Sequence, residues 1–201
     1  MVVLRNETGS QPIELATARV RLRVIEPSDL TALYRAELDG SMIHRWRFGS
    51  STPSPEQYAA RLWQGVHSQY LILDSTAPSS ERPIGMVTSY GFDPVNGFCN
   101  VAAMRLHDGV LASALFVEGC ALFFDSLFMG APLRKLYFEA PEYNLPEFQT
   151  AIRIELMEEE ARLKNHRFFR DRYWDQVILA ITRERWNEYR RYVPGLQQPS
   201  V

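Results

Sequence analysis

Apolar side chains recur every second residue in some stretches of this chain and every third or fourth residue in others. The stretch ARVRLRVI (18–25) alternates aliphatic residues with arginines, which predicts a strand with one buried face. Similar alternation or short apolar runs predict six further strands, at 68–74, 83–92, 97–106, 133–140, 160–169 and 173–182. The turn sequence DPVNG favours a hairpin between the strands at 83–92 and 97–106.

Helical periodicity fills most of the remaining chain. It predicts helices at 26–39, 54–66, 109–128, 145–160 and 183–193. Ser54 is the expected N-cap of the second helix, and Pro55 suits its first turn. The third helix is apolar on most sides, so we expect it to be well buried, along the stripe Val110, Ala114, Val117, Ala121, Phe124 and Phe128.

The order of elements predicts an α+β fold with a mixed sheet. Neighbouring hairpins account for the early strands, and one strand–helix–strand crossover falls near residues 98–140. Residues 1–17 are interpreted as a polar leader, residues 18–192 as one domain and residues 193–201 as a tail.

Composition narrows the classes of protein to consider. The 201 residues are 46% hydrophobic, enough for a sizeable core, and a net charge of −2 gives no general argument for a nucleic-acid partner. Cys99 and Cys120 do not form a disulfide framework, so we expect them to be reduced and buried in a cytoplasmic protein. No signal pattern or apolar run of membrane-spanning length is apparent, which predicts no membrane partner. The histidines are scattered, and we expect no metal site.

Several stretches together resemble one known family. VRLRVIEPSDLTALYR resembles its opening strand and helix, and PIGMVTSYGFDPVNGFCNVAAM resembles its central hairpin. LRKLYFEAPEYN resembles its fifth strand, and EEEARLKNHRFFRDRYWDQVILAITRERW its closing hairpin. The family is the GCN5-related N-acetyltransferase (GNAT) superfamily, in particular the branch that acetylates ribosomal-protein N-termini and small-molecule amines. The resemblance covers about residues 18–187.

The resemblance implies a fold and a reaction. The expected fold is a twisted, mostly antiparallel mixed sheet of about seven strands flanked by helices, with the fourth and fifth strands splayed apart. Acetyl-CoA or another acyl-CoA would be the donor, with its pantetheine arm between the splayed strands. The acceptor would be a small-molecule or peptide amine, and the protein a monomer or homodimer.

The turn after the fourth strand departs from the family pattern. In the family it carries Gln/Arg-x-x-Gly-x-Gly/Ala, whose backbone N–H groups bind the cofactor pyrophosphate at a helix N-terminus. The aligned residues 106–111 keep only Gly109, with Leu106, Asp108 and Leu111 at the other positions of the pattern. Gly109 and Val110 are the predicted pyrophosphate contacts, while Asp108 is also a good N-cap that would compete for the same N–H groups.

Further roles follow from the resemblance on the two splayed strands. A backbone N–H in the fourth strand would polarise the thioester oxygen, which places it at Val101, Ala102 or Ala103. Asn144 matches the family's asparagine, which binds the pantetheine or orders the loop.

Amine acylation also needs a base for the ammonium proton and an acid for the departing thiolate. The position of the family's acidic tyrosine is Ala151, so Tyr143 is the substitute that we consider. Glu139 and Glu142, at the end of the fifth strand, and His107 are the candidate bases.

The acceptor contacts are predicted from position. Ser89 and Tyr90 face opposite sides of a strand, and one of them should face the acceptor. The other predicted substrate contacts lie in the loop after the first helix and on the last strand: Arg45, Trp46, Arg47, Tyr173 and Asp175.

Two alternatives remain open. The departures at the pyrophosphate turn would suit an enzyme whose donor is an aminoacyl-tRNA or a carrier-protein thioester. Basic residues late in the chain would suit such a donor's phosphates: Arg162, Lys164, Arg167, Arg170, Arg172, Arg183, Arg185, Arg190 and Arg191. The second alternative is a non-catalytic binding module.

Overall fold

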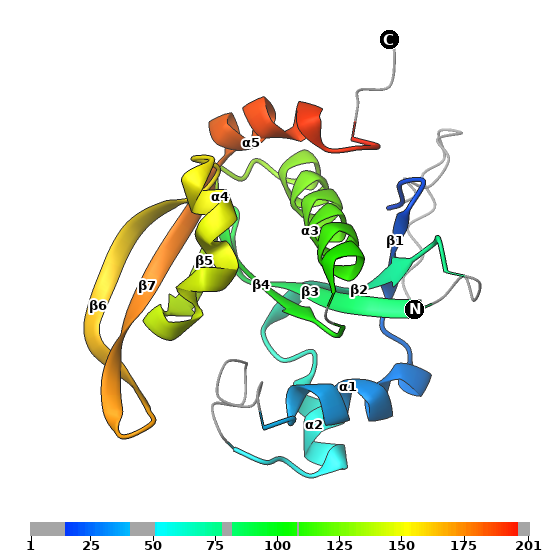
Figure 1. Cartoon of the computed structure of the whole chain (residues 1–201), viewed down its shortest axis with the longest axis vertical. Coiled ribbons are helices and arrows are strands. Elements are labelled where there is room, and N and C mark those ends of the chain that lie inside the picture. Colours follow the sequence, from blue (N-terminus) through cyan, green and yellow to red (C-terminus); the bar gives the residue numbers. More distant parts are fainter. Residues whose placement is uncertain (1–14, 41–50, 78–81, 108, 197–201) are drawn as a thin grey trace.

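The computed structural model describes residues 15–40, 51–77, 82–107 and 109–196. They form one seven-stranded sheet of order β1-β2-β3-β4-β5-β7-β6 (Figure 1). The strands are β1 (Val20–Val24), β2 (Val66–Asp74), β3 (Arg82–Asp93), β4 (Phe98–Arg105), β5 (Lys135–Pro141), β6 (Glu158–Phe169) and β7 (Arg172–Thr182). Neighbours pair antiparallel, with the exception of β4 and β5, which are parallel and joined by a crossover helix.

The helices lie on both faces of the sheet. They are α1 (Leu30–Glu37), α2 (Pro55–Arg61), α3 (Val110–Gly130), α4 (Gln149–Arg153) and α5 (Arg183–Tyr189), with 3₁₀ turns at Pro27–Asp29, Glu142–Phe148 and Arg190–Tyr192. Ser54 caps α2 as predicted, because its hydroxyl accepts from the Gln57 N–H and the Gln57 side chain returns to the Ser54 N–H. The α+β class and the mixed sheet are confirmed.

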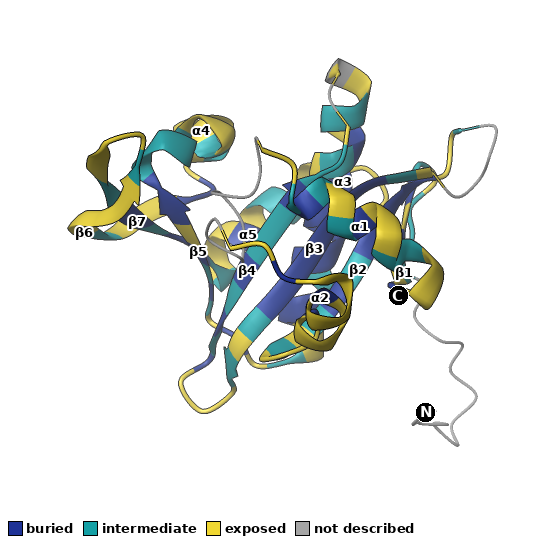
Figure 2. Cartoon of the chain, turned by 90° about the horizontal axis from the view of Figure 1, so that it is seen from below, coloured by how far each residue is buried: buried dark blue, intermediate teal, exposed yellow. Residues whose placement is uncertain are grey.

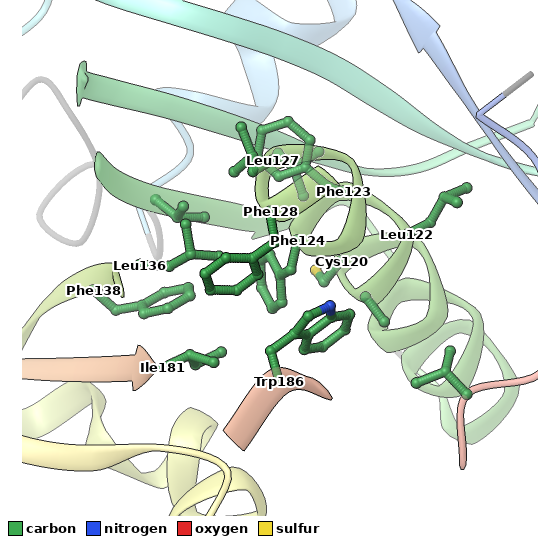
Figure 3. Packing of buried hydrophobic residues seen from close by; sticks show 14 of the residues in the cluster. Cys120, Leu122, Phe123, Phe124, Leu127, Phe128, Leu136, Phe138, Ile181 and Trp186 are labelled. Carbon is green, nitrogen blue, oxygen red and sulfur yellow. The ribbon is translucent and has the colours of Figure 1, made fainter. Parts of the chain in front are cut away.

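Two apolar clusters hold the layers together, one on each face of the sheet. The larger cluster packs α3 and α5 on one face, where Phe124 lies edge-on to both Phe138 and Trp186 (Figure 3). The smaller cluster packs α1 and α2 on the opposite face and includes Met86 and Met104. Buried residues accordingly concentrate in the central strands, and exposed residues on the β6–β7 hairpin and the outer sides of α1 and α2 (Figure 2).

Helix α3 differs from its prediction in two ways. Its segment Leu111–Gly130 is long and apolar enough to cross a membrane, so the prediction that no run reaches that length was wrong. In the structure 56% of an 18-residue window of this segment is buried, and the segment packs at the centre of the larger cluster. The predicted buried stripe holds at Ala121, Phe124 and Phe128 but not at Ala114 and Val117, which are exposed.

The predicted helix over 145–160 was wrong in extent. Its first part is a 3₁₀ turn that contains Pro146, and the α-helix proper is only α4. Glu155 then adopts a left-handed conformation at φ 58°, and the N–H groups of Leu156 and Met157 both donate to the Ala151 carbonyl. This closes the helix in the manner of a left-handed cap and directs the chain into β6.

The ends of the described chain pack onto the core. Leu15 contacts the larger cluster, and Ala16 forms a β-bridge with Arg21. At the other end, Val193 and Leu196 are buried members of the same cluster. Residues that were assigned to the leader and the tail therefore contribute to the core.

Candidate functional site

The separation of β4 from β5 opens a cleft among the described residues. Both strands lie within the described residues and pair at three positions, the last being Asn100 opposite Tyr137. Beyond this pair, β4 continues to Arg105 and β5 to Pro141 without further pairing. The diverging strands, together with α1 to α4, enclose a cleft of about 1340 Å³.

The alternation of side chains gives this cleft two sides. Met86 and Met104 pack with α1 and α2, so Thr88 and Tyr90 on β3, and Ala102 on β4, share that side. We call this the α1/α2 side, and the opposite one, toward the larger cluster, the α3 side. The cleft passes between the strands and joins the two sides.

The α3 side is a mostly apolar channel. It is lined by residues of β4, α3, β5, α4 and α5: Val101, Ala103, Phe116, Val117, Cys120, Ala121, Phe124, Phe138, Ala151, Ile154, Trp186 and Tyr189. Gly85 makes room for this wall, because a Cβ there would lie 2.4 Å from Cδ2 of Phe116. A glycine in β3 thus sets how closely α3 approaches the sheet.

The beginning of α3 lies beside the polar end of this channel. Gly109 occupies the N-cap position at φ 122°, a conformation that favours glycine. The Arg105 guanidinium donates to the Ser113 hydroxyl at 3.1 Å and lies 3.7 Å from a Glu147 carboxylate oxygen. A helix N-terminus with a neighbouring guanidinium is a favourable environment for an anion.

Charged and polar groups line the α1/α2 side. Phe138 belongs to the larger cluster, so the next residue of β5, Glu139, is directed to the opposite face with Tyr90. Arg167, from β6, also lines the cleft, and its Nε donates to Gln176 Oε1 at 3.0 Å. Gln176 is 2% exposed, so this hydrogen bond anchors the Nε of the exposed Arg167 side chain to a buried partner.

Two buried polar atoms in the cleft wall have no hydrogen-bond partner among the described residues. They are Oγ1 of Thr88 and Oδ1 of Asn144. Buried polar groups are nearly always paired, because leaving one unpaired costs about 1–3 kcal/mol. Groups of this kind in a cleft wall are well suited to a ligand.

The backbone of β4 also presents a donor to the opening. The Leu106 N–H donates to the Ile84 carbonyl at 2.9 Å, so alternate residues Met104 and Ala102 direct their backbone groups toward β3. Ala103 directs its N–H and carbonyl the other way, toward β5. Since β5 has already diverged at this level, the Ala103 N–H points into the space between the strands.

Burial raises the pKa of two groups that line the cleft. It raises the pKa of Tyr90 to about 12, with a further increase from Glu139 and an opposing effect of Arg167. Burial likewise raises the pKa of the Cys120 thiol to about 12. At neutral pH the Tyr90 hydroxyl therefore remains a hydrogen-bond donor, and Cys120 remains an unreactive thiol.

The sequence and the structure were compared with known proteins. No protein-family model and no curated protein matches the sequence. Among solved structures, a spermidine N-acetyltransferase from Vibrio cholerae in complex with CoA and spermine has a TM-score of 0.67 at 17% identity, covering 84% of this chain and 98% of that one. An acetyltransferase of the GNAT family from Bacillus anthracis has a TM-score of 0.64 at 12% identity, covering 86% of this chain and 99% of that one. The chain has the GNAT fold.

The GNAT fold confirms the predicted architecture, including the parallel β4 and β5 that splay. The assignment to the branch that acts on ribosomal proteins stays a prediction. Seven of the predicted site residues line the cleft: Tyr90, Val101, Ala102, Ala103, His107, Glu139 and Asn144. The structure therefore brings predicted donor contacts and two candidate bases, His107 and Glu139, into a single space.

Other predicted site residues have different surroundings. Glu142 forms an ion pair with Arg162, and Tyr143 packs against Phe169 and Trp174, away from the cleft lining. Ser89 exchanges a hydrogen bond with Ser68 at 2.7 Å on the α3 face, so Tyr90 is the member of the pair that faces the cleft. These placements give Glu142, Tyr143 and Ser89 structural contacts and no contact with the cleft.

The predicted residues of the last strand are absent from the cleft lining, and the predicted pyrophosphate contacts lie next to it. Tyr173 is exposed against Phe168, and Asp175 pairs with Arg162, so neither lines the cleft. Gly109 and Val110 begin α3, next to the cleft lining. The remaining predictions lie outside the described residues: Arg45, Trp46, Arg47 and Asp108.

Sequence reasoning did not assign Thr88 to the site, considered Arg167 only as part of a basic set for a tRNA or carrier-protein donor, and did not consider Gln176, which holds Arg167 from outside the cleft lining. Thr88 could have been found, because the period of two puts it on the same face as Tyr90. Arg167 and Gln176 come from different strands, and no local pattern connects them. The described residues contain no group of three or more His, Cys, Asp or Glu side chains that could hold a metal ion.

Proposed function

We propose that the protein transfers an acyl group from a CoA thioester to a small-molecule amine. The observation that carries this proposal is the open space between β4 and β5, which joins an apolar channel on one side to a polar pocket on the other. A thioester that lay in the channel would place its carbonyl between the strands, within reach of an amine in the pocket. The two reactants would thus meet from opposite sides of the sheet.

The residues present fit a CoA-type donor in part. The channel wall is apolar, and the orphaned Oδ1 of Asn144 could accept a hydrogen bond from a pantetheine amide. Arg105 beside the start of α3 could offset the loss of the family's basic residue at Leu106. These features support acyl-CoA as the donor despite the altered pyrophosphate turn.

The chemistry assigns roles to three groups of the chain. The amine nitrogen attacks the thioester carbonyl, so that a C–N bond forms as the C–S bond breaks. Glu139 accepts the proton from the amine, and the Ala103 N–H donates to the carbonyl oxygen as negative charge develops there. The Tyr90 hydroxyl, which keeps its proton, can donate a hydrogen bond to the departing sulfur, and the thiol takes its proton from solvent.

The structure offers little support for a tRNA donor. Several of the late basic side chains already have partners within the protein. Arg162 pairs with three carboxylates, Arg183 donates to the carbonyls of Leu133 and Ala131, and Arg190 forms two hydrogen bonds with Asp125. These three arginines therefore form ion pairs and hydrogen bonds within the protein and do not form one free basic surface.

The proposal is tested by binding and by turnover. Calorimetric titration of acetyl-CoA should show micromolar binding, and incubation with a panel of amines should release free CoA. Absence of acyl-CoA binding, together with binding of aminoacyl-tRNA that weakens steeply with salt, would overturn the CoA donor in favour of a tRNA donor. Absence of both would favour a non-catalytic module.

A pair of variants tests the assignment of the base. Glu139→Gln should lower kcat by roughly 10²- to 10⁴-fold with acetyl-CoA affinity unchanged, because a general base contributes that much. Glu142→Gln is the matched control, since Glu142 directly follows the same strand but contacts Arg162 outside the cleft. Equal losses in the two variants would contradict the assignment.

A further inference from the structure

The α1/α2 side of the cleft carries more positive than negative side chains. Among the described residues that line it, the charged ones are Arg35, Asp39, Arg61, Glu139 and Arg167. Three guanidinium groups against two carboxylates leave an excess of one positive charge, which disfavours an acceptor such as a polyamine that carries only positive charge. The charge balance of this pocket thus points away from polycationic acceptors.

Arg167 is the best prepared of these groups to bind an anion. Its Nε is occupied by Gln176 Oε1, and no carboxylate of the described residues pairs with its guanidinium. The Arg167 side chain is exposed, and this one hydrogen bond anchors its Nε to the almost fully buried Gln176, while its two terminal nitrogens make no hydrogen bond among the described residues. An oriented guanidinium fork matches the geometry of a carboxylate or phosphate.

The group of opposite charge lies in the same pocket. Glu139 has no ion-pair partner among the described residues, although it faces the same side of the cleft as Arg167. Both groups act electrostatically on the Tyr90 hydroxyl, in opposite directions, so both lie near it. Two opposite charges that line one cleft without pairing to each other leave room for a ligand that carries both charges.

The buried hydroxyl of Thr88 provides an independent indication of a ligand on this side. Thr88 is 4% exposed, lines the cleft on the same face as Tyr90, and its Oγ1 has no partner among the described residues. A polar ligand in the pocket would satisfy this atom and remove the cost of leaving it unpaired.

We infer that the acceptor is an amine that also carries an anionic group, with its ammonium at Glu139 and its carboxylate or phosphate at Arg167. α-Amino acids and aminoalkyl phosphates share this chemistry. The inference rests on the proposed acyl transfer for its reaction, and it adds the class of acceptor and the residue that selects it.

The first test compares matched acceptors. CoA release from acetyl-CoA is measured for a panel of amino acids, for the amide of each, for aminoalkyl phosphates and for spermidine. We expect kcat/KM for the anionic acceptors to exceed that for their neutral or polycationic counterparts by roughly tenfold to hundredfold, the value of a charge-assisted hydrogen bond. The relative rates of the amino acids and the aminoalkyl phosphates distinguish carboxylate from phosphate. A preference for the amides or for spermidine would overturn the inference but leave the acyl transfer intact.

Substitutions test the selecting residue. Arg167→Gln should raise KM for the anionic acceptors by roughly tenfold and leave KM for the amides and the affinity for acetyl-CoA unchanged. Arg167→Lys should recover only part of the loss, because an ammonium cannot reproduce the fork held by Gln176. Lys164→Gln is the control, since it removes the same charge from the same strand outside the cleft. Equal effects of Arg167→Gln and Lys164→Gln would mean that the preference for anionic acceptors depends only on the overall positive charge. That result would contradict the assignment of Arg167.

Binding without turnover separates this inference from the proposed function. The same acceptors are titrated calorimetrically into the protein saturated with CoA. Binding of anionic amines that is lost in Arg167→Gln supports the inference even if no acyl transfer is seen. Absence of that binding overturns it.

Discussion

Two neighbouring residues of β3 differ in whether their hydroxyl groups have a hydrogen-bond partner. Thr88 and Ser89 are neighbours in β3, and both are buried, yet only Ser89 has a hydrogen-bond partner, the Ser68 hydroxyl, among the described residues. The difference follows from direction, because Ser89 faces the packed α3 layer and Thr88 faces the cleft. We interpret this contrast as stability given up at the site.

Thr88→Val should separate stability from function. It removes an unpaired buried hydroxyl, so the free energy of unfolding should rise by about 1 kcal/mol and Tm by ~2–4 °C. Acceptor turnover should fall, since the ligand loses its partner. Thermal unfolding and CoA release on the same sample provide the two readouts.

Ser89→Ala is the matched control for that variant. This substitution removes the hydrogen bond between Ser89 and Ser68 and leaves the Ser68 hydroxyl without that partner in the packed layer. It should therefore destabilise the protein by about 1 kcal/mol with little change in KM for the acceptor. If Thr88→Val lowered Tm as much as Ser89→Ala, the orphaned hydroxyl would not be a cost to the free protein.

At the scale of elements, glycine sets the distance between α3 and the sheet at two places. A Cβ on Gly85 would lie 2.4 Å from a ring carbon of Phe116, and one on Gly119 would lie 2.3 Å from Cγ2 of Ile72. Both contacts are between α3 and the central strands, but only Phe116 lines the cleft. The two glycines therefore share a packing role and differ in their relation to the site.

Gly85→Ala and Gly119→Ala test this difference. Each should destabilise the protein by roughly 1–3 kcal/mol, because overpacking forces the helix outward. Gly85→Ala should in addition weaken acetyl-CoA binding, since Phe116 must move into the channel. Chemical denaturation and calorimetry measure the two effects. Equal acetyl-CoA affinities in the two variants would show that Phe116 does not shape the donor channel.

The elements that sequence predicted well are those with a strong local pattern. The alternation at 18–25 and the apolar runs of the hairpin strands gave the sheet, and Ser54 with Pro55 gave the start of α2. The predicted helix at 145–160 was too long because Leu156 and Met157 are buried in the turn that precedes β6, so their apolar signal came from a turn. Periodicity does not distinguish a buried turn from another helical turn.

The candidate site was harder to predict than the fold, for a related reason. Residues implied by the GNAT resemblance, such as Ala103 and Asn144, do line the cleft. Arg167, Gln176 and Thr88 come together from β6, β7 and β3, so their proximity depends on the tertiary arrangement alone. Tyr143 shows the converse, because this predicted catalytic residue packs against Trp174 and does not line the cleft.

At the scale of the whole molecule, the sheet is divided at the cleft. Strands β1 to β4 form one part and β5 to β7 the other, and β4 pairs with β5 at three positions. Beyond the last of these pairs, Asn100 with Tyr137, β4 and β5 face each other across the cleft without backbone pairing. A donor lying between them would contact both parts at once and would connect them.

Acetyl-CoA should therefore stabilise the molecule across this division. At a concentration of 100 times Kd it should raise Tm by roughly 5–10 °C. Hydrogen exchange followed by mass spectrometry should slow in the end of β4 that contains Ala103 and in the end of β5 that contains Glu139, because both edges become covered. The hairpin turn at Arg170 and Asp171, which does not itself line the cleft, should exchange at an unchanged rate. Protection confined to one part of the sheet would place the donor on a single surface, and the space between the strands would then not be its binding site.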